Sequence, residues 1–266
     1  MSAKEPLTVF IDNQEVKFNV QPVIKNGRTL VEFRTLFERF GFEVKWDSSQ
    51  RKIIGTKGSD TLQMQIGKKE ASINNETILE LDVAPEIINN RTFIPLRFVS
   101  EVSGGLVHFF PRTKEIYIFY SLNYKLNYAI NVNELEAVRL FLQMGADPNF
   151  VNSYDQSMLI EAMREGTDVK IVKALLEAGA NPNTKDYNGL SPLVRATQFL
   201  RPDIVQLLLQ HGADINSKTN IGKSVLDVAK DQVNQDLVDW AKEKTKEIIT
   251  ILEHELRINK KINTAA

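Results

Sequence analysis

The sequence predicts a chain of two parts. The first is an α+β module, internally duplicated and built of β-hairpins with short helices, and the second is an all-α solenoid of repeats with a C-terminal capping helix. A stretch of the first half recurs 63 positions later, and small residues in the second half recur with a period of about 33. Near residue 120 the alternating apolar pattern becomes helical, so we expect domains at 1–120 and 121–266.

The duplication in the first half aligns without a gap. Residues 22–34 match residues 85–97 at a constant offset of 63, with identical or similar side chains at many positions. The same offset continues through the pairs Glu38/Glu101, Gly41/Gly104, Val44/Val107 and Trp46/Phe109. This match predicts two similar α+β units that share one core.

Each copy predicts a turn followed by a helix. Asn26-Gly27 and Asn89-Asn90 tolerate positive φ and mark turns ahead of short apolar runs at 30–31 and 93–94. A helix of about two turns follows in each copy and ends at Gly41 or Gly104, because glycine suits a left-handed helix cap.

The strands predicted around these helices form hairpins. Alternating apolar residues predict that 42–46 pairs with 52–54, and that 107–109 pairs with 116–119. Another hairpin precedes each copy, over 8–20 around Asp12-Asn13 and over 62–73 around Gly67-Lys68.

These residues resemble the copper amine oxidase N-terminal domain over roughly residues 7–120. The pattern is a turn, Arg-Thr, apolar residues and a second arginine, which ends as Pro95-Leu96-Arg97 in the second copy and Glu32-Phe33-Arg34 in the first. The first copy keeps Trp46-Asp47 in its later strand, where the second has Phe109-Phe110. The resemblance implies a bacterial protein that is secreted or on the cell surface. It implies no copper chemistry, since this module is separate from an oxidase's copper site.

One charged pair recurs on the predicted helices. Arg34 and Glu38, like Arg97 and Glu101, are four residues apart and share a helix face. They would form either a ligand clamp or an ion pair that orients the helix on the sheet. Recurrence in both copies favours the ion pair.

The second half repeats short signals at a spacing of 33 or 34 residues. The recurring positions are the glycines Gly145, Gly179 and Gly212, the alanines Ala129, Ala162, Ala196 and Ala229, and the leucines Leu126, Leu159, Leu193 and Leu226. An apolar stripe precedes each glycine, at 138–142, 171–176 and 204–209, as expected for a helix that the glycine caps.

This spacing resembles ankyrin repeats, about four of them over residues 122–240. Ser191-Pro192-Leu193 is similar to the Thr-Pro-Leu-His start of that repeat, although the histidine is missing from every copy. Residues 234–258 predict a long charged helix, which we expect to cap the open end of the stack.

Composition and motifs indicate no catalytic, cofactor or metal site. The chain has no cysteine, and its three histidines, His108, His211 and His254, lie in different predicted elements. Residues 1–120 carry 16 lysines and arginines against 15 aspartates and glutamates, and residues 121–266 carry 17 against 19, so neither half offers the positive field that nucleic acid requires. Apolar runs are too short for a membrane-spanning helix.

The resemblance to ankyrin repeats implies a partner-binding surface of hairpin tips and inner helices. The residues expected there are Tyr154, Gln156, Arg164, Tyr187, Leu190, Arg195, Asn220 and Lys223. Exposed tyrosine supplies contact area at low entropic cost. Alternatively, Tyr154 and Tyr187 stack on each other as part of the scaffold.

We therefore expect a non-enzymatic protein whose repeats bind a protein partner, with the first module as an anchor or spacer. The alternative is a cell-envelope protein whose first module binds wall polymer or another surface component. We expect secretion or display at the cell surface after removal of a signal peptide. The alternative is a cytoplasmic protein, because ankyrin arrays are often cytosolic.

Overall fold

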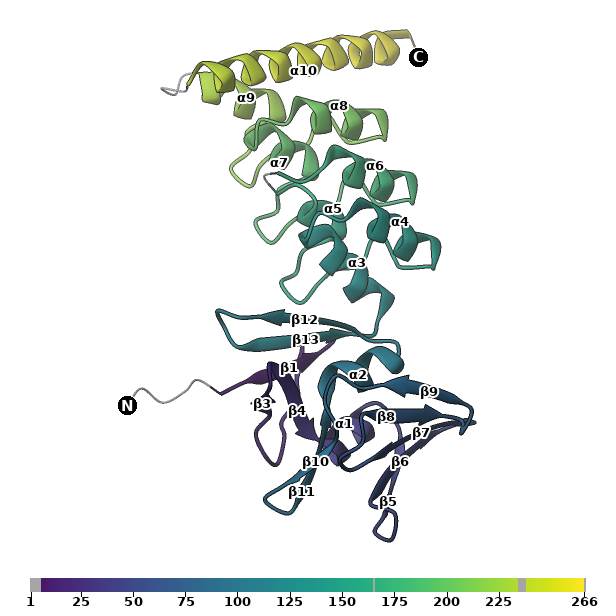
Figure 1. Cartoon of the computed structure of the whole chain (residues 1–266). Helices are drawn as coiled ribbons and strands as arrows, with labels where there is room; N and C mark the ends of the chain where they lie inside the picture. The colour runs from purple at the N-terminus through teal and green to yellow at the C-terminus, as the bar shows by residue number, and fades with distance from the viewer. Residues whose placement is uncertain (1–5, 165, 234–237, 266) are drawn as a thin grey trace, which may run out of the picture. The chain divides into compact units, whose positions relative to one another are not determined.

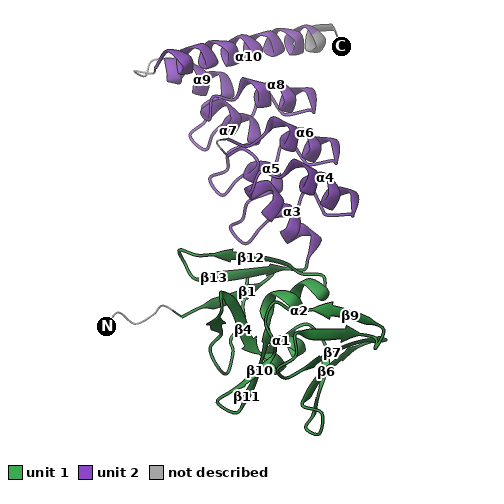
Figure 2. Cartoon of the chain, viewed as in Figure 1, with its two compact units in different colours: residues 1–120 green, residues 121–266 purple. Residues whose placement is uncertain are grey.

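A computed structural model of the chain describes residues 6–164, 166–233 and 238–265, with side chains up to residue 261. The chain divides into two compact units, Met1–Tyr120 and Ser121–Ala266 (Figures 1 and 2). None of the helices that the structure describes combines the length and the apolar composition needed to span a membrane.

The first unit is rich in sheet, with one short helix in each copy of the duplication. The first copy comprises β1 (Thr8–Ile11), β2 (Gln14–Glu15), β3 (Val23–Lys25), β4 (Arg28–Glu32), α1 (Phe33–Arg39), β5 (Glu43–Asp47) and β6 (Lys52–Lys57). The rest comprises β7 (Asp60–Gln65), β8 (Glu70–Ile73), β9 (Thr77–Glu80), β10 (Glu86–Ile88), β11 (Arg91–Pro95), α2 (Leu96–Val102), β12 (Leu106–Phe110) and β13 (Glu115–Phe119). The sheet orders are β12-β13-β1-β2, β10-β11-β4-β3 and β5-β6-β7-β8-β9.

The two copies meet about a local twofold relation. Strands β4 and β11 pair antiparallel, and Val31 lies opposite Ile94. These two residues occupy equivalent positions of the duplication, so the pairing places each copy's central strand against its own counterpart. The neighbouring hairpin strands β3 and β10 then form the two edges of the same sheet.

The copies also exchange their outer hairpins. β1 pairs in parallel with β13, so the hairpin β1–β2 extends the second copy's hairpin β12–β13. The hairpins that the sequence predicts over 8–20 and 62–73 both form, although the first ends at Glu15 instead of Val20. The structure adds β9, which the sequence reading missed. β8–β9 turns at Asn74 and Asn75 with positive φ, as β1–β2 does at Asp12 and Asn13, and is therefore its counterpart.

Residues of both copies fill one core. Helices α1 and α2 bury Leu36, Phe37, Leu96 and Val99, and the central strands bury Val31 and Ile94 in the same cluster. Gly55 on β6 lies directly beneath the ring of Phe37, so closely that a methyl group there would overlap the ring. Close packing of this kind requires glycine at that position.

The second unit is a stack of helix pairs ending in one long helix. Its elements are α3 (Leu122–Asn131), α4 (Leu135–Gln143), α5 (Met158–Glu161), α6 (Val169–Glu177), α7 (Pro192–Gln198), α8 (Pro202–Gln210), α9 (Val225–Val233) and α10 (Asp239–Ala265). One core runs through the stack and includes Leu126, Leu159 and Leu193 of successive repeats. Ile248 and Leu252 of α10 belong to that core, so α10 covers the last repeat.

Asparagine side chains tie successive repeats together. Asn149 Oδ1 accepts a hydrogen bond from Asn181 N at 2.7 Å, and its Nδ2 donates to Gly179 O at 3.0 Å. One repeat later, Asn183 makes the same two bonds to Asp214 N and Gly212 O. These bonds satisfy backbone groups at the helix ends, which would otherwise need water.

Candidate functional site

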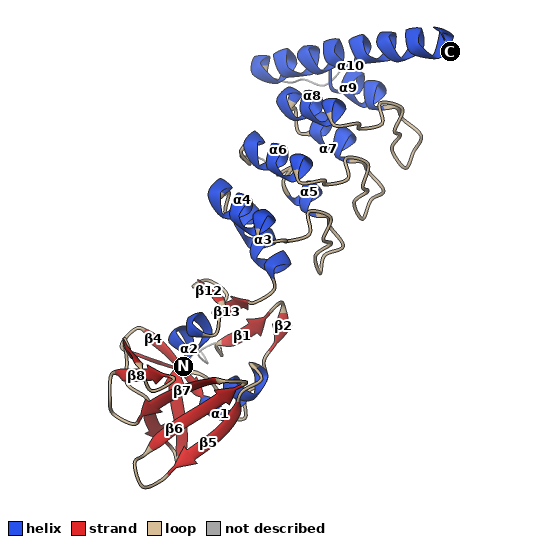
Figure 3. Cartoon of the chain, turned by 90° about the vertical axis from the view of Figure 1, so that its right-hand side faces the viewer, coloured by secondary structure: helices blue, strands red, loops and turns tan. Residues whose placement is uncertain are grey.

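Three loops of the second unit carry exposed apolar tips. They connect α4 to α5, α6 to α7 and α8 to α9, and they project from the same side of the stack (Figure 3). Their tips hold Tyr154, Tyr187 and Ile221, which are 74%, 66% and 73% exposed. Large apolar side chains held this far out of the core are suited to contact with another molecule.

Each loop is held by one polar side chain at its base. Asn152 Oδ1 accepts from Tyr154 N and Gln156 N, and Asp186 Oδ1 accepts from Asn188 N and Leu190 N. In the third loop Thr219 Oγ1 accepts from Lys223 N. Fixed loops lose less conformational entropy when a partner binds, so the tips are pre-organised for contact.

Charged groups beneath the loops fix those polar side chains in turn. Arg195 Nε donates to Asp186 Oδ2 at 2.5 Å, and its Nη2 pairs with the same oxygen. In the preceding repeat, Asn152 Nδ2 donates to the buried Glu161, which pairs with Arg164. Arg195, predicted as a contact residue, therefore supports the loop of Tyr187 from below.

The other predicted contact residues differ in how exposed their side chains are. Arg164, Asn220 and Lys223 are exposed, and Gln156 is half-buried. Leu190 is only 7% exposed and packs in the core, so it offers a partner little surface. Its apolar character therefore belongs to the fold.

Tyr154 and Tyr187 make no ring contact with each other among the described residues. Their backbones occupy neighbouring rather than equivalent places on the two tips, since Tyr154 precedes the helix-capping Ser157 by three residues and Tyr187 precedes Ser191 by four. Both rings are open to solvent, which favours contact with a partner over a role in the scaffold.

The sequence reading missed a second row of exposed apolar side chains. Val132 and Phe199 cap the C-terminal ends of α3 and α7, and both are exposed. Each stands directly before a residue with positive φ, Asn133 or Leu200, which turns the chain away from the helix. Asn133 was an available signal for the first turn, because asparagine tolerates positive φ, whereas Leu200 gave none for the second.

Local contacts shift the pKa of several side chains in the described part of the chain. The hydrogen bond from Ser49 lowers the pKa of Asp47. Burial opposes the effect at Asp203, yet the hydrogen bond and charge of Arg201 bring its pKa below the usual value. Burial, aided by the charge of Arg97, lowers the pKa of His108. No three acidic or histidine side chains gather as metal ligands among these residues.

A stack of helix pairs with loops turned to one side defines a repeat protein of the ankyrin class. Residues 126–219 match the family of ankyrin repeats, in three copies, and residues 10–118 match the copper amine oxidase N-terminal domain. The chain belongs to the ankyrin-repeat proteins, and it carries a copper amine oxidase N-terminal domain ahead of the repeats.

Several curated proteins are similar over shorter stretches. The cyclin-dependent kinase inhibitor 2A of Monodelphis domestica is 32% identical over 120 residues, which cover 45% of this chain and 69% of that protein. The 2-5A-dependent ribonuclease of Homo sapiens is 49% identical over 61 residues, covering 23% of this chain and 8% of the ribonuclease. The regulatory protein NPR5 of Arabidopsis thaliana is 33% identical over 112 residues, or 40% and 21% of the two chains. The ribonuclease and NPR5 are thus matched over less than two thirds of their length.

Proposed function

We propose that this protein is a non-enzymatic binding protein whose ankyrin repeats hold a protein partner, with the first unit as an anchor or spacer. The repeats and their relatives, which include an inhibitor and a regulatory protein by name, support an interaction role. The observation that carries the proposal is the row of exposed tips, Tyr154, Tyr187 and Ile221, on hydrogen-bonded loops.

Paired capture and affinity measurements test this proposal. The full chain and its Tyr154→Ala/Tyr187→Ala variant are used as bait in cells of the source organism, and proteins retained only by the wild type are purified. Each tyrosine should contribute about 1–2 kcal/mol to the affinity for such a partner, while the melting temperature changes little, because surface substitutions usually cost within about 0.5 kcal/mol.

Leu140→Ala is the matched control, since Leu140 lies on the outer helix α4 and is 51% exposed. Equal affinity of the tyrosine variant and the wild type for every captured protein would contradict binding through the tips. A lower melting temperature of the tyrosine variant would instead show that the tips are part of the scaffold.

We also propose that the protein is exported by a bacterial cell to its surface. The support is the resemblance of the first unit to domains of bacterial surface and secreted proteins. Fractionation of the source cells, with an antibody against the chain, should find it in the envelope or the medium. Recovery in the cytoplasmic fraction alone would refute export.

A second candidate function is binding of a wall polymer or another surface component through the first unit. Two cavities in that unit favour it, and both are lined by arginine and aromatic side chains.

A further inference from the structure

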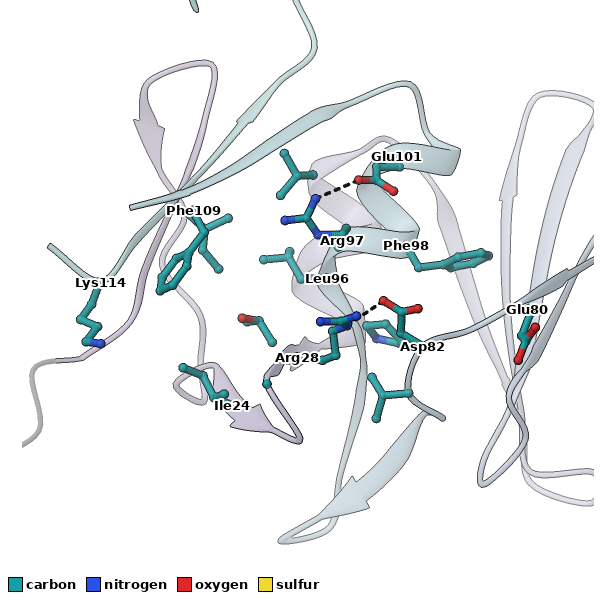
Figure 4. Close-up of a pocket in the computed structure, with 16 residues that line it drawn as sticks. Ile24, Arg28, Glu80, Asp82, Leu96, Arg97, Phe98, Glu101, Phe109 and Lys114 are labelled. Atoms are coloured by element: carbon teal, nitrogen blue, oxygen red, sulfur yellow. Dashed lines mark hydrogen bonds and ion pairs between the residues drawn. The ribbon is translucent and has the colours of Figure 1, made fainter. Parts of the chain in front are cut away.

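Two cavities of the first unit lie between the copies of the duplication. The first has a volume of about 430 Å³ and lies among the β3–β4 hairpin of one copy and the α2 and β12 elements of the other (Figure 4). The second has a volume of about 560 Å³ and lies among the β10–β11 hairpin, the start of α1 and β5. Each cavity is thus built from parts of both copies.

Each residue that lines the second cavity has its equivalent, at the offset of 63, in the lining of the first. The equivalent pairs include Ile24/Ile87, Arg28/Arg91, Thr29/Thr92, Leu96/Phe33, Arg97/Arg34 and Phe109/Trp46. The local twofold relation that pairs β4 with β11 therefore also generates two related cavities. Both keep two arginines, an aromatic ring and an apolar wall.

The arginines retain donors for a ligand. Arg28 Nε donates to Asp82 at 2.6 Å, Arg97 Nη1 donates to Glu101 at 3.2 Å, and Arg91 Nη1 donates to Glu32 at 3.0 Å. Each pair uses one nitrogen of a guanidinium that carries five N–H donors. Arg34 forms no ion pair with any described residue.

Two arginines recur in both cavities, and the first cavity also holds Lys114 and the carboxylates of Glu80, Asp82 and Glu101. The carboxylates that pair with the equivalent Arg28 and Arg91 come from different places in the duplication, Asp82 and Glu32. The position equivalent to Asp82 is Asn19, which lines the second cavity. Arg28 and Arg91 occupy equivalent positions, whereas the carboxylates that pair with them do not. We therefore infer that the arginines are retained for a ligand common to both cavities, and that this ligand is an anion.

The rest of the lining narrows the chemistry of that anion. Figure 4 shows Phe109 across the first cavity from Arg28 and Arg97, and Trp46 takes the place of Phe109 in the second. A planar guanidinium binds a carboxylate through two parallel hydrogen bonds. A flat aromatic ring offers a face to the C–H groups of a sugar ring. Two equivalent cavities suit a ligand that itself repeats.

We propose that the two cavities bind carboxylate-bearing sugar units of a single acidic polysaccharide. This inference rests on the second candidate function above and names its ligand chemistry. It is independent of partner binding by the repeats. Occupation of both cavities by one polymer makes the second contact intramolecular, which raises the apparent affinity without any new contact.

Isothermal titration of the full chain with galacturonic acid oligomers tests the inference. A long oligomer should bind at least about 100-fold more tightly than the single sugar, as expected when one molecule reaches both cavities. Arg34→Gln or Arg97→Gln should each weaken binding of the long oligomer by about 10- to 100-fold, and the double variant should abolish it. Arg112→Gln, an exposed arginine outside both linings, is the matched control and should bind as the wild type does.

Methyl-esterified oligomers of the same length have the same sugar rings without the charge. Equal binding of the esterified and the free oligomer would overturn the inference but leave polymer binding by the first unit standing. An absence of binding by the free oligomer, or unchanged binding by the arginine variants, would overturn it as well.

Fluorescence separates the two cavities. Trp46 lines the second cavity, and the chain's other tryptophan, Trp240, can be removed as Trp240→Phe. Trp46 emission should then respond to the oligomer, and Arg34→Gln should remove the response at concentrations where Arg97→Gln keeps it. A response that both substitutions reduce equally would contradict two separate sites.

Discussion

Arg195 shows how a residue on the expected binding face can serve the fold. The repeat register places it on an inner helix, and the structure turns its guanidinium to the buried carboxylate of Asp186. That carboxylate holds the backbone of the loop that presents Tyr187. The sequence could not distinguish the two roles, because the pairing depends on how the loop folds back over the helix.

We predict that Arg195→Ala destabilises the protein, by roughly 3 kcal/mol, because it leaves a buried carboxylate without its counter-charge. Chemical denaturation followed by circular dichroism measures this loss. Arg139→Ala is the control: Arg139 pairs with the exposed Glu136, so this substitution should change stability by less than about 1 kcal/mol. Equal losses of stability from the two substitutions would show that the Arg195–Asp186 pair contributes no more than an exposed surface pair.

Ser224 and Asp227 form a reciprocal pair at the start of α9. Ser224 Oγ and N both donate to Asp227 Oδ2, at 2.6 and 3.0 Å, and Asp227 N donates back to Ser224 Oγ at 3.1 Å. This is the geometry of a capping box, with aspartate in the usual place of glutamate. The hydrogen bond from the Ser224 side chain is the main reason that the pKa of Asp227 lies below its ordinary value of 3.8.

Ser224→Ala should therefore raise the pKa of Asp227 towards 3.8, as measured by NMR titration of its carboxyl carbon. Because the folded-state pKa is lowered, the stabilisation is present above the unfolded value and is lost as pH falls through the folded value. The wild type should thus lose more stability than the variant as pH falls through this range. Ser191→Ala, in the preceding repeat, should leave the titration of Asp227 unchanged.

Strands and helices were predictable to different degrees. Apolar periodicity located α6 and α8, since their buried faces recur with each turn. β9 has one half-buried and three exposed residues, so no alternation marked it. The exchange of hairpins could not be predicted either, because pairing of β1 with β13 joins ends of the unit that local pattern cannot relate. The cavities were hidden for the same reason, since each combines residues of both copies.

Strand β6 depends on the absence of a side chain at Gly55, so we predict that Gly55→Ala destabilises the first unit by about 1–3 kcal/mol through overpacking against Phe37. Urea denaturation of the full chain measures this. Adding Phe37→Leu should recover part of the loss, because the two residues are in contact and their effects are coupled. A neutral Gly55→Ala would mean that helix α1 can shift away from the sheet at no cost.

At the scale of the whole molecule, the hydrophobic clusters of the two units are separate: the repeats have one and the first unit has a large and a small one. The core of the repeats and those of the first unit share no residue. Independent cores are the usual mark of domains that can fold alone.

We predict that limited proteolysis cuts first at about residues 119–124 and releases fragments that stay folded. Fragments 1–120 and 121–266, produced separately, should each give a cooperative melting transition. Earlier cleavage within residues 20–100 would contradict this division.

The exchange of hairpins also sets the order in which the protein can fold while it is made. β1 leaves the ribosome well before its partner β13, which ends at Phe119. At about 5–20 residues per second, β1 waits several seconds with its edge unpaired. The repeats that follow need only their sequence neighbours and can add one after another. A nascent chain stalled before β13 would therefore hold an unfinished first domain, and chaperones that shield unpaired strands should act mainly in that interval.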